Sequence, residues 1–187
     1  FLPVALSVWG LDSLNRFILQ NMTDPEQTAI YGVGVRVSSV VAIFLFGLQM
    51  SWHPHSYKLM QEPEIPSQPF VSAANWLWFL GGTIVTWLGI FSAEATYILA
   101  GSNYLESRHV VFWMGFSALL WSFFYIATSG YQYAMKSKHN LFTVPVGLLF
   151  VVIGSPFVAK HWGAAGVAAM SFFGYWIAVG IGSWKAN

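Results

Sequence analysis

An apolar stretch long enough to cross a membrane dominates the sequence and runs from Ala29 to Trp52. A helix of this length spans the roughly 30 Å hydrocarbon core of a bilayer. The stretch contains one formal charge, Arg36, about two helical turns from its start. Because an arginine that faces lipid costs several kcal/mol, we expect Arg36 to face a protein interior or a watery cavity. We expect the helix to end at Pro54, which lacks a backbone donor and clashes with the preceding turn.

The composition of the 187 residues points to the same environment, with 56% hydrophobic and 8% charged residues. Soluble domains contain about 25% charged residues, so this chain is predicted to be an all-α integral membrane protein in contact with the lipid bilayer. Nothing in its net charge of +1 suggests a nucleic-acid partner. The lack of cysteine excludes disulfides and thiolate chemistry. The chain begins at Phe1 inside an apolar segment, which predicts a fragment of a longer protein.

The apolar pattern predicts about six membrane-spanning helices, at residues 3–19, 28–52, 71–91, 109–133, 141–159 and 164–184. The apolar segment 95–100 is too short to span, and it either extends the third helix or lies at the membrane interface. In the last span Gly174, Ala178 and Gly182 recur every four residues. Such a ridge of small residues permits close contact between helices.

The positive charges between the predicted spans give an orientation. Lys58, Lys136, Lys138 and Lys185 follow the second, fourth and sixth spans, whereas only Arg108 and Lys160 follow the third and fifth. Lysine and arginine are enriched in cytoplasmic loops. The first group is therefore predicted to be cytoplasmic, which places both ends of this multi-pass chain there.

Three charged residues inside the spans are the candidate substrate-binding residues. Asp12 and Arg16 share a helix face at a spacing of four, in the favourable acid-before-base order. Either the pair only lowers the cost of inserting the first helix into the membrane, or it lines a transport cavity. Arg36 has no acid within one turn of its own helix, so its partner comes from another helix, where Asp12 is the nearest intramembrane candidate, from a missing part of the protein or from a ligand. It is either half of a structural ion pair or an anion contact, because guanidinium binds phosphate through two hydrogen bonds.

The remaining candidates point less clearly to chemistry. Glu94 is expected at the interface, with a proton- or cation-coupling carboxylate as the alternative. His53 and His55 flank Pro54, and a helix corner is favoured over a metal site because no third ligand is near in sequence. Lys136, Lys138 and His139 form a predicted cytoplasmic anchor. No enzyme motif is present, so we predict neither catalysis, nor a cofactor, nor a metal.

Several short segments resemble the C-terminal half of bacterial polysaccharide flippases of the multidrug/oligosaccharidyl-lipid/polysaccharide exporter superfamily. Residues 16–19 (RFIL) look like the end of the helix that opens the second lobe, and residues 30–36 (IYGVGVR) resemble the start of the next helix. Residues 49–54 (QMSWHP) are similar to that helix's aromatic-proline ending. Residues 101–104 (GSNY) resemble the turn before the fourth span, and residues 162–166 (WGAAG) resemble the entry to a late helix. The family often has aspartate before the arginine that corresponds to Arg16, where this chain has Asn15.

The resemblance implies one lobe, residues 1–187, of a two-lobed transporter whose N-terminal lobe is missing. It implies a bacterial plasma-membrane flippase that moves polyprenyl-diphosphate-linked oligosaccharide by alternating access for surface polysaccharide synthesis. One alternative is a cation-coupled multidrug exporter of the same superfamily, which would need intramembrane acids such as Asp12. A membrane enzyme of glycan assembly, with His53 or His55 as base, is a further alternative.

Overall fold

The computed structural model describes residues 2–62, 67–127 and 140–184, and almost all of them are helical. Among these residues there is no β-strand. Four helical stretches are long and apolar enough to cross a membrane: Pro25–Leu59, Gln68–Ile90, Ser107–Ile126 and Val144–Ile181. The prediction of an all-α membrane protein is confirmed at this level.

Helices α1 (Leu2–Met22) and α2 (Pro25–Leu59) are joined by a tight polar turn. Thr23 closes α1 by donating a hydrogen bond from its Oγ1 to the carbonyl of Leu19, at 2.7 Å. Asp24 precedes α2 in extended backbone, and Pro25 occupies the first position of the helix, where a missing N–H costs nothing. The turn reverses the chain and makes α1 and α2 neighbours at this end.

The prediction that Pro54 ends the second helix is wrong, because α2 continues to Leu59. A proline inside a helix removes one backbone hydrogen bond, and packing on both sides of it can offset that loss. Trp52 packs edge-on against Phe70 with ring centroids 5.3 Å apart. His53 packs against Tyr125 with centroids 4.8 Å apart and also hydrogen-bonds its hydroxyl. His53 also stacks on Tyr57 of the same helix with centroids 5.7 Å apart, and this contact bridges the proline.

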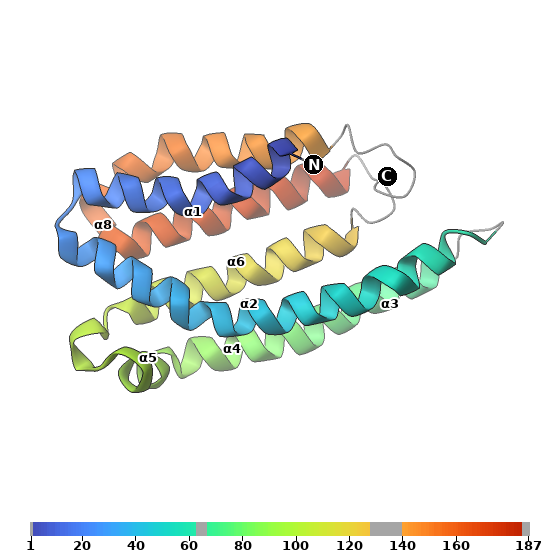
Figure 1. The fold of residues 1–187 in the computed structure, drawn as a ribbon, viewed down its shortest axis with the longest axis horizontal. Coiled ribbons are helices and arrows are strands. Elements are labelled where there is room, and N and C mark those ends of the chain that lie inside the picture. The colour runs from blue at the N-terminus through green and yellow to red at the C-terminus, as the bar shows by residue number, and fades with distance from the viewer. Residues whose placement is uncertain (1, 63–66, 128–139, 185–187) are drawn as a thin grey trace.

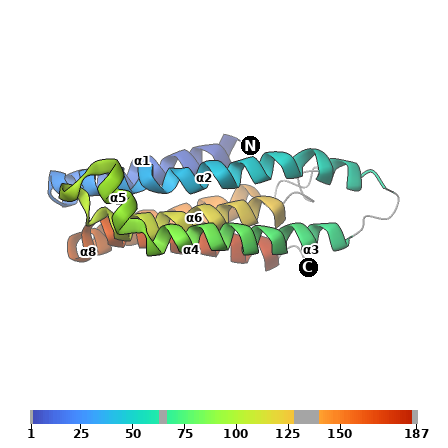
Figure 2. The same cartoon turned by 90° about the horizontal axis from the view of Figure 1, so that it is seen from below.

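The third apolar segment forms one nearly continuous rod. It consists of α3 (Ser67–Trp76), a π-helical stretch η1 (Leu77–Gly81) and α4 (Gly82–Ile90). A break at Phe91 separates this rod from α5 (Ser92–Ala100), which is followed by the 3-10 turn η2 (Ser102–Tyr104). Helix α5 does not extend the rod but runs across the end of the bundle, as a comparison of Figures 1 and 2 shows.

The last two elements are α6 (Ser107–Ala127) and α8 (Asn140–Trp184). Helix α8 contains two helical segments that meet at Gly163, whose φ of 54° and ψ of −140° are not helical. Glycine alone adopts this backbone readily. Figure 1 shows the two segments, orange and red, running back along each other. The predicted break between residues 159 and 164 is therefore present.

The two segments of α8 approach closely where the predicted small-residue ridge lies. A Cβ atom on Gly147 would fall 2.5 Å from the carbonyl oxygen of Gly174 and 3.5 Å from the Cβ of Ala178. Only glycine fits at such a backbone contact. The surroundings of Gly182, the third residue of the ridge, lie outside the described part of the chain.

The helices form an elongated bundle in two layers. Helices α1 and α2 lie on one side, with α4, α6 and α8 on the other (Figure 2). Helix α1 packs mainly on α8, α2 packs mainly on α6, and α6 also packs on α8. Two buried clusters hold these contacts. One joins α1, α2, α6 and α8 around Leu19, Tyr31 and Val110, and the other joins α2, η1, α4 and α6 around Leu45 and Leu119.

Candidate functional site

Arg36 lies on an exposed face of α2, at a level about halfway along the neighbouring α1 and a third of the way along α2 itself. It is eleven residues from the start of the helix, or roughly 17 Å along the axis, whereas α1 extends about 31 Å from the same turn. The residue is exposed. Among the side chains that the structure describes, none forms an ion pair with Arg36. Its guanidinium is therefore placed to meet a group that the described part of the chain does not supply.

A groove of about 350 Å³ between α2 and α6 continues from the Arg36 position. We call it the central groove, and its lining is Ser39, Ala42, Ile43, Phe46, Gln49, Ala118, Trp121 and Ser122. Ser39 and Ile43 are three and seven residues after Arg36, so all three lie on one face of α2. The Oγ of Ser39 donates to the carbonyl of Arg36 at 2.6 Å.

The central groove has a polar floor inside an otherwise apolar wall. Gln49 is 6% exposed, and its Nε2 donates a hydrogen bond to the Oγ of Ser122 at 2.6 Å. Trp121 also contacts the ring of Tyr175 on α8, with centroids 5.7 Å apart. The groove therefore lies on the side of α6 that faces α8. The walls of the central groove suit an apolar molecule, and Arg36 supplies a cation one turn beyond the end of the groove.

The other two predicted substrate-binding residues lie on α1. Arg16 is exposed and is six residues from the end of the helix. Asp12 lies on the same helix, but its side chain is outside the described side chains. The predicted Asp12–Arg16 and Asp12–Arg36 pairs therefore stay predictions. The structure places Arg16 and Arg36 on exposed faces of consecutive helices.

A buried polar junction that the sequence analysis missed joins three helices. Asn15 is 1% exposed, and its Nδ2 lies 3.1 Å from the Oη of Tyr31 and 2.7 Å from the Oγ of Ser171. These bonds link α1, α2 and the second segment of α8. The sequence feature that could have predicted this junction is an amide side chain inside an apolar span. A buried polar side chain needs hydrogen-bond partners, which neighbouring helices must supply. Here Asn15 is a structural crosslink beside the charged face of α1.

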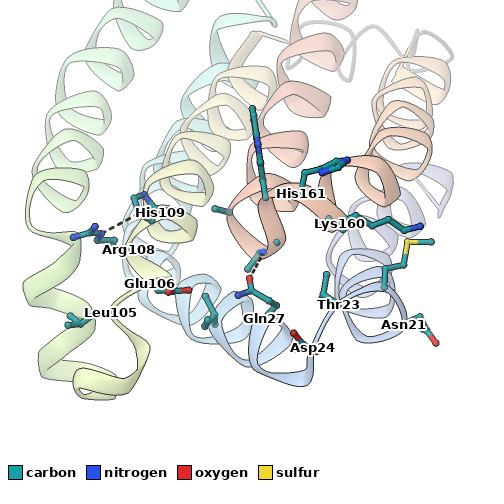
Figure 3. Close-up of a pocket in the computed structure, with 17 residues that line it drawn as sticks. Asn21, Thr23, Asp24, Gln27, Leu105, Glu106, Arg108, His109, Lys160 and His161 are labelled. Carbon is teal, nitrogen blue, oxygen red and sulfur yellow. Dashed lines mark hydrogen bonds between the residues drawn. The ribbon is translucent and has the colours of Figure 1, made fainter.

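A polar depression of about 990 Å³ lies at one end of the bundle (Figure 3). We call it the end depression. Three chain reversals meet there: the α1–α2 turn, the start of α6 and the bend of α8. Its charged and histidine side chains are Asp24, Glu106, Arg108, His109, Lys160 and His161. Acids and bases are mixed, so the depression offers no net preference for an anion.

One partly buried hydrogen bond joins α2 to α8 at the floor of the end depression. The Oε1 of Gln27 accepts a hydrogen bond from the backbone N–H of Ala164 at 2.9 Å, shown as a dashed line in Figure 3. Ala164 is the first residue after the bend at Gly163, where a helix start leaves N–H groups without partners. Any Cβ on Gly163 would collide with the side chain of Gln27. Gln27 thus caps the second segment of α8 from α2.

The remaining predicted candidates are dispersed. Glu94 is exposed in the first turn of α5, and His53 bonds to Tyr125. His55 is exposed on α2. No group of three or more histidine, cysteine, aspartate or glutamate side chains gathers as a metal site within the described residues. Residues Lys136, Lys138 and His139 lie outside the described ranges.

Comparison of the chain with family models, with curated proteins and with solved structures found no match.

Proposed function

We propose that the chain is one lobe of a transporter that flips polyprenyl-diphosphate-linked oligosaccharide across a bacterial plasma membrane. The proposal combines the sequence resemblance with one observation, which is the exposed Arg36 inside a membrane-spanning helix, eleven residues from its start. Ionisable residues at this depth mark substrate or ion pathways. The described chain does not neutralise this charge, so an anionic cargo is the partner that fits best.

The chemistry of the cargo matches the surface around Arg36. A diphosphate presents several oxygens that a planar guanidinium contacts through paired hydrogen bonds. The central groove next to it has apolar walls and a polar floor at Gln49, which suits the region where a lipid chain joins a polar headgroup. Arg16 supplies a second exposed cation on α1.

The proposed architecture has six membrane crossings. These are α1, α2, the α3–η1–α4 rod, α6 and the two segments of α8. With the predicted orientation, the start of α1 and the end of α8 lie at the cytoplasmic side and the end depression lies at the opposite side. A second lobe, supplied by a missing N-terminal part, would cover the Arg36 face. Transport would proceed by rocking of the two lobes around the headgroup, without covalent chemistry by the protein.

A gene-deletion strain tests the proposal directly. Loss of the intact gene is expected to leave lipid-linked oligosaccharide on the cytoplasmic leaflet and to remove surface polysaccharide. The gene restored with Arg36→Ala is expected to give at least a tenfold lower export than the wild type, at equal membrane abundance. Asn75→Ala, at an exposed position on α3, is the matched control and should restore export fully. Unchanged lipid-linked intermediates in the deletion strain would contradict the proposal.

The same strain distinguishes the multidrug-exporter alternative. That function requires an intramembrane acid for a cationic drug or a coupling ion. Drug sensitivity in the deletion strain that Asp12→Asn fails to correct, together with normal surface polysaccharide, would favour the exporter.

A further inference from the structure

A second groove lies between α2, the α3–η1 rod and the end of α6, toward the opposite end of α2 from the end depression. Figure 1 shows α2 and α3 extending past the end of α6 in this region. We call it the lateral groove. It has a volume of about 310 Å³ and is lined by Leu48, Ser51, Trp52, His55, Ala73, Trp76, Leu77, Leu80 and Ile126. None of these residues belongs to the central groove.

The π-helical stretch shapes the deep end of the lateral groove. A Cβ on Gly81 would lie 2.7 Å from Leu119 and 2.9 Å from Leu45, so the rod touches α6 and α2 tightly at this point. Leu80, directly before Gly81, and Leu77, about one turn earlier, form a wall of the groove. Single π-turns inside helices occur frequently at functional sites. Close contact at Gly81 therefore closes the groove at one end and leaves it open toward the start of α3.

The polarity of the groove changes in one direction along α2. Leu48 lies at the apolar end, Trp52 lies one turn further, and His55 follows at the open end. Lys58 is exposed and follows His55 by three residues and Ser51 by seven, so it continues the same helix face. On the facing rod, the lining residues are Leu80 and Leu77, with Trp76 and Ala73 nearer the start of α3.

This order matches the profile of one bilayer leaflet, from hydrocarbon through the aromatic belt to charged headgroups. We propose that the lateral groove binds an anionic phospholipid of the surrounding bilayer. One acyl chain lies between Leu48 and η1, and the phosphate lies beside His55 and Lys58. The only acid near this end is Glu62 among the described residues, and it lies beyond the end of α2. The inference needs a membrane environment but does not depend on the transported cargo.

Photolabelling of the protein in nanodiscs tests this site. The probes are phosphatidylglycerol and phosphatidylcholine with a diazirine in the acyl chain, and the labelled peptides are mapped by mass spectrometry. Peptides covering residues 48–58 and 73–80 are expected to take up phosphatidylglycerol about fivefold more than phosphatidylcholine, the ratio for one lysine at an anionic surface. Equal labelling by both lipids in the wild-type protein would overturn the proposal.

Three variants separate the groove from general lipid contact. Lys58→Gln should remove the preference for phosphatidylglycerol while labelling by phosphatidylcholine stays unchanged. Lys160→Gln, at the other end of the bundle, should leave the preference intact. Ala73→Trp fills the groove and should lower labelling of these peptides by both lipids, with labelling elsewhere retained as the folding control. Persistence of the preference in Lys58→Gln would overturn the proposal. Displacement of the label by equimolar polyprenyl phosphate, but not by phosphatidylglycerol, would overturn it too.

Discussion

Two polar side chains on neighbouring helices, Asn15 on α1 and Arg36 on α2, have opposite surroundings. Asn15 is 1% exposed and is hydrogen-bonded to Tyr31 and Ser171. Arg36 is exposed, and no described side chain forms an ion pair with it. The NH2 group of Asn15 is satisfied within the bundle, because neighbouring helices supply hydroxyl groups, whereas its Oδ1 is buried without a hydrogen-bond partner among the described residues. The charge of Arg36, by contrast, stays available to a partner outside the described chain. This difference distinguishes Asn15, a structural residue, from Arg36, a candidate binding residue.

The same contrast extends to the helices that hold these residues. The α1–α8 side of the bundle is closed by small-residue contacts and buried polar bonds, so substitutions there should reduce stability. The exposed face of α2 has few internal contacts to lose, so substitutions there should change function at unchanged stability. Three stability predictions test the first half of this comparison, in order of decreasing effect.

The contact between the two segments of α8 should be the most sensitive position. Gly147→Ala places a Cβ 2.5 Å from the carbonyl oxygen of Gly174 and forces the segments apart. Overpacking of this kind costs about 1–3 kcal/mol, and we expect about 3 kcal/mol because the obstacle is backbone. The free energy of unfolding in mixed micelles measures the loss. Gly47→Ala on the exposed face of α2 meets no atom within 4 Å and should be neutral or stabilising. Equal losses at both glycines would contradict the comparison.

The buried polar junction should rank second. Asn15→Ala leaves the hydroxyls of Tyr31 and Ser171 without their amide partner, which should cost about 1–2 kcal/mol in the free energy of unfolding. Ser171 retains a bond to the carbonyl of Val167 at 3.2 Å, and this limits the loss. The control is Asn75→Ala, where the amide is exposed. A variant at Asn15 as stable as wild type would show that the junction does not hold the helices.

The cap at the bend of α8 should have the smallest effect. Gln27→Ala removes the acceptor for the N–H of Ala164 and should cost about 1 kcal/mol. Gln27→Glu keeps an acceptor oxygen and adds a negative charge at a helix start, so its unfolding free energy should match or exceed that of the wild type. Thermal unfolding of the two variants in the same detergent compares them. A loss in Gln27→Glu equal to that in Gln27→Ala would contradict the capping role.

Much of the fold follows from the apolar pattern, and the exceptions have identifiable causes. The pattern predicted the helical regions, and the predicted gap at residues 159–164 contains the bend at Gly163. Pro54 misled the analysis, because sequence does not show that Trp52 and His53 find aromatic partners on other helices. A proline marks a helix end only where tertiary packing does not offset the lost hydrogen bond.

The candidate site was predictable only in part. A charge within an apolar span identified Arg36 without any knowledge of its neighbours. The central groove needs residues from α2 and α6, which are about 70 positions apart in sequence, as Gln49 and Ser122 illustrate. The junction of Asn15 with Ser171 spans an even larger separation of 156 positions. Local periodicity cannot pair residues this far apart.

The most direct test of the account is binding of a polyprenyl-diphosphate-linked oligosaccharide to the purified full-length protein, with the wild type and Arg36→Ala compared. Arg36→Lys is the matched variant, because lysine keeps the charge and loses the paired hydrogen bonds. The account predicts that Arg36→Ala raises Kd about tenfold or more at an unchanged unfolding free energy, with Arg36→Lys between the two. A folded Arg36→Ala variant that binds the lipid as tightly as the wild type would contradict the account.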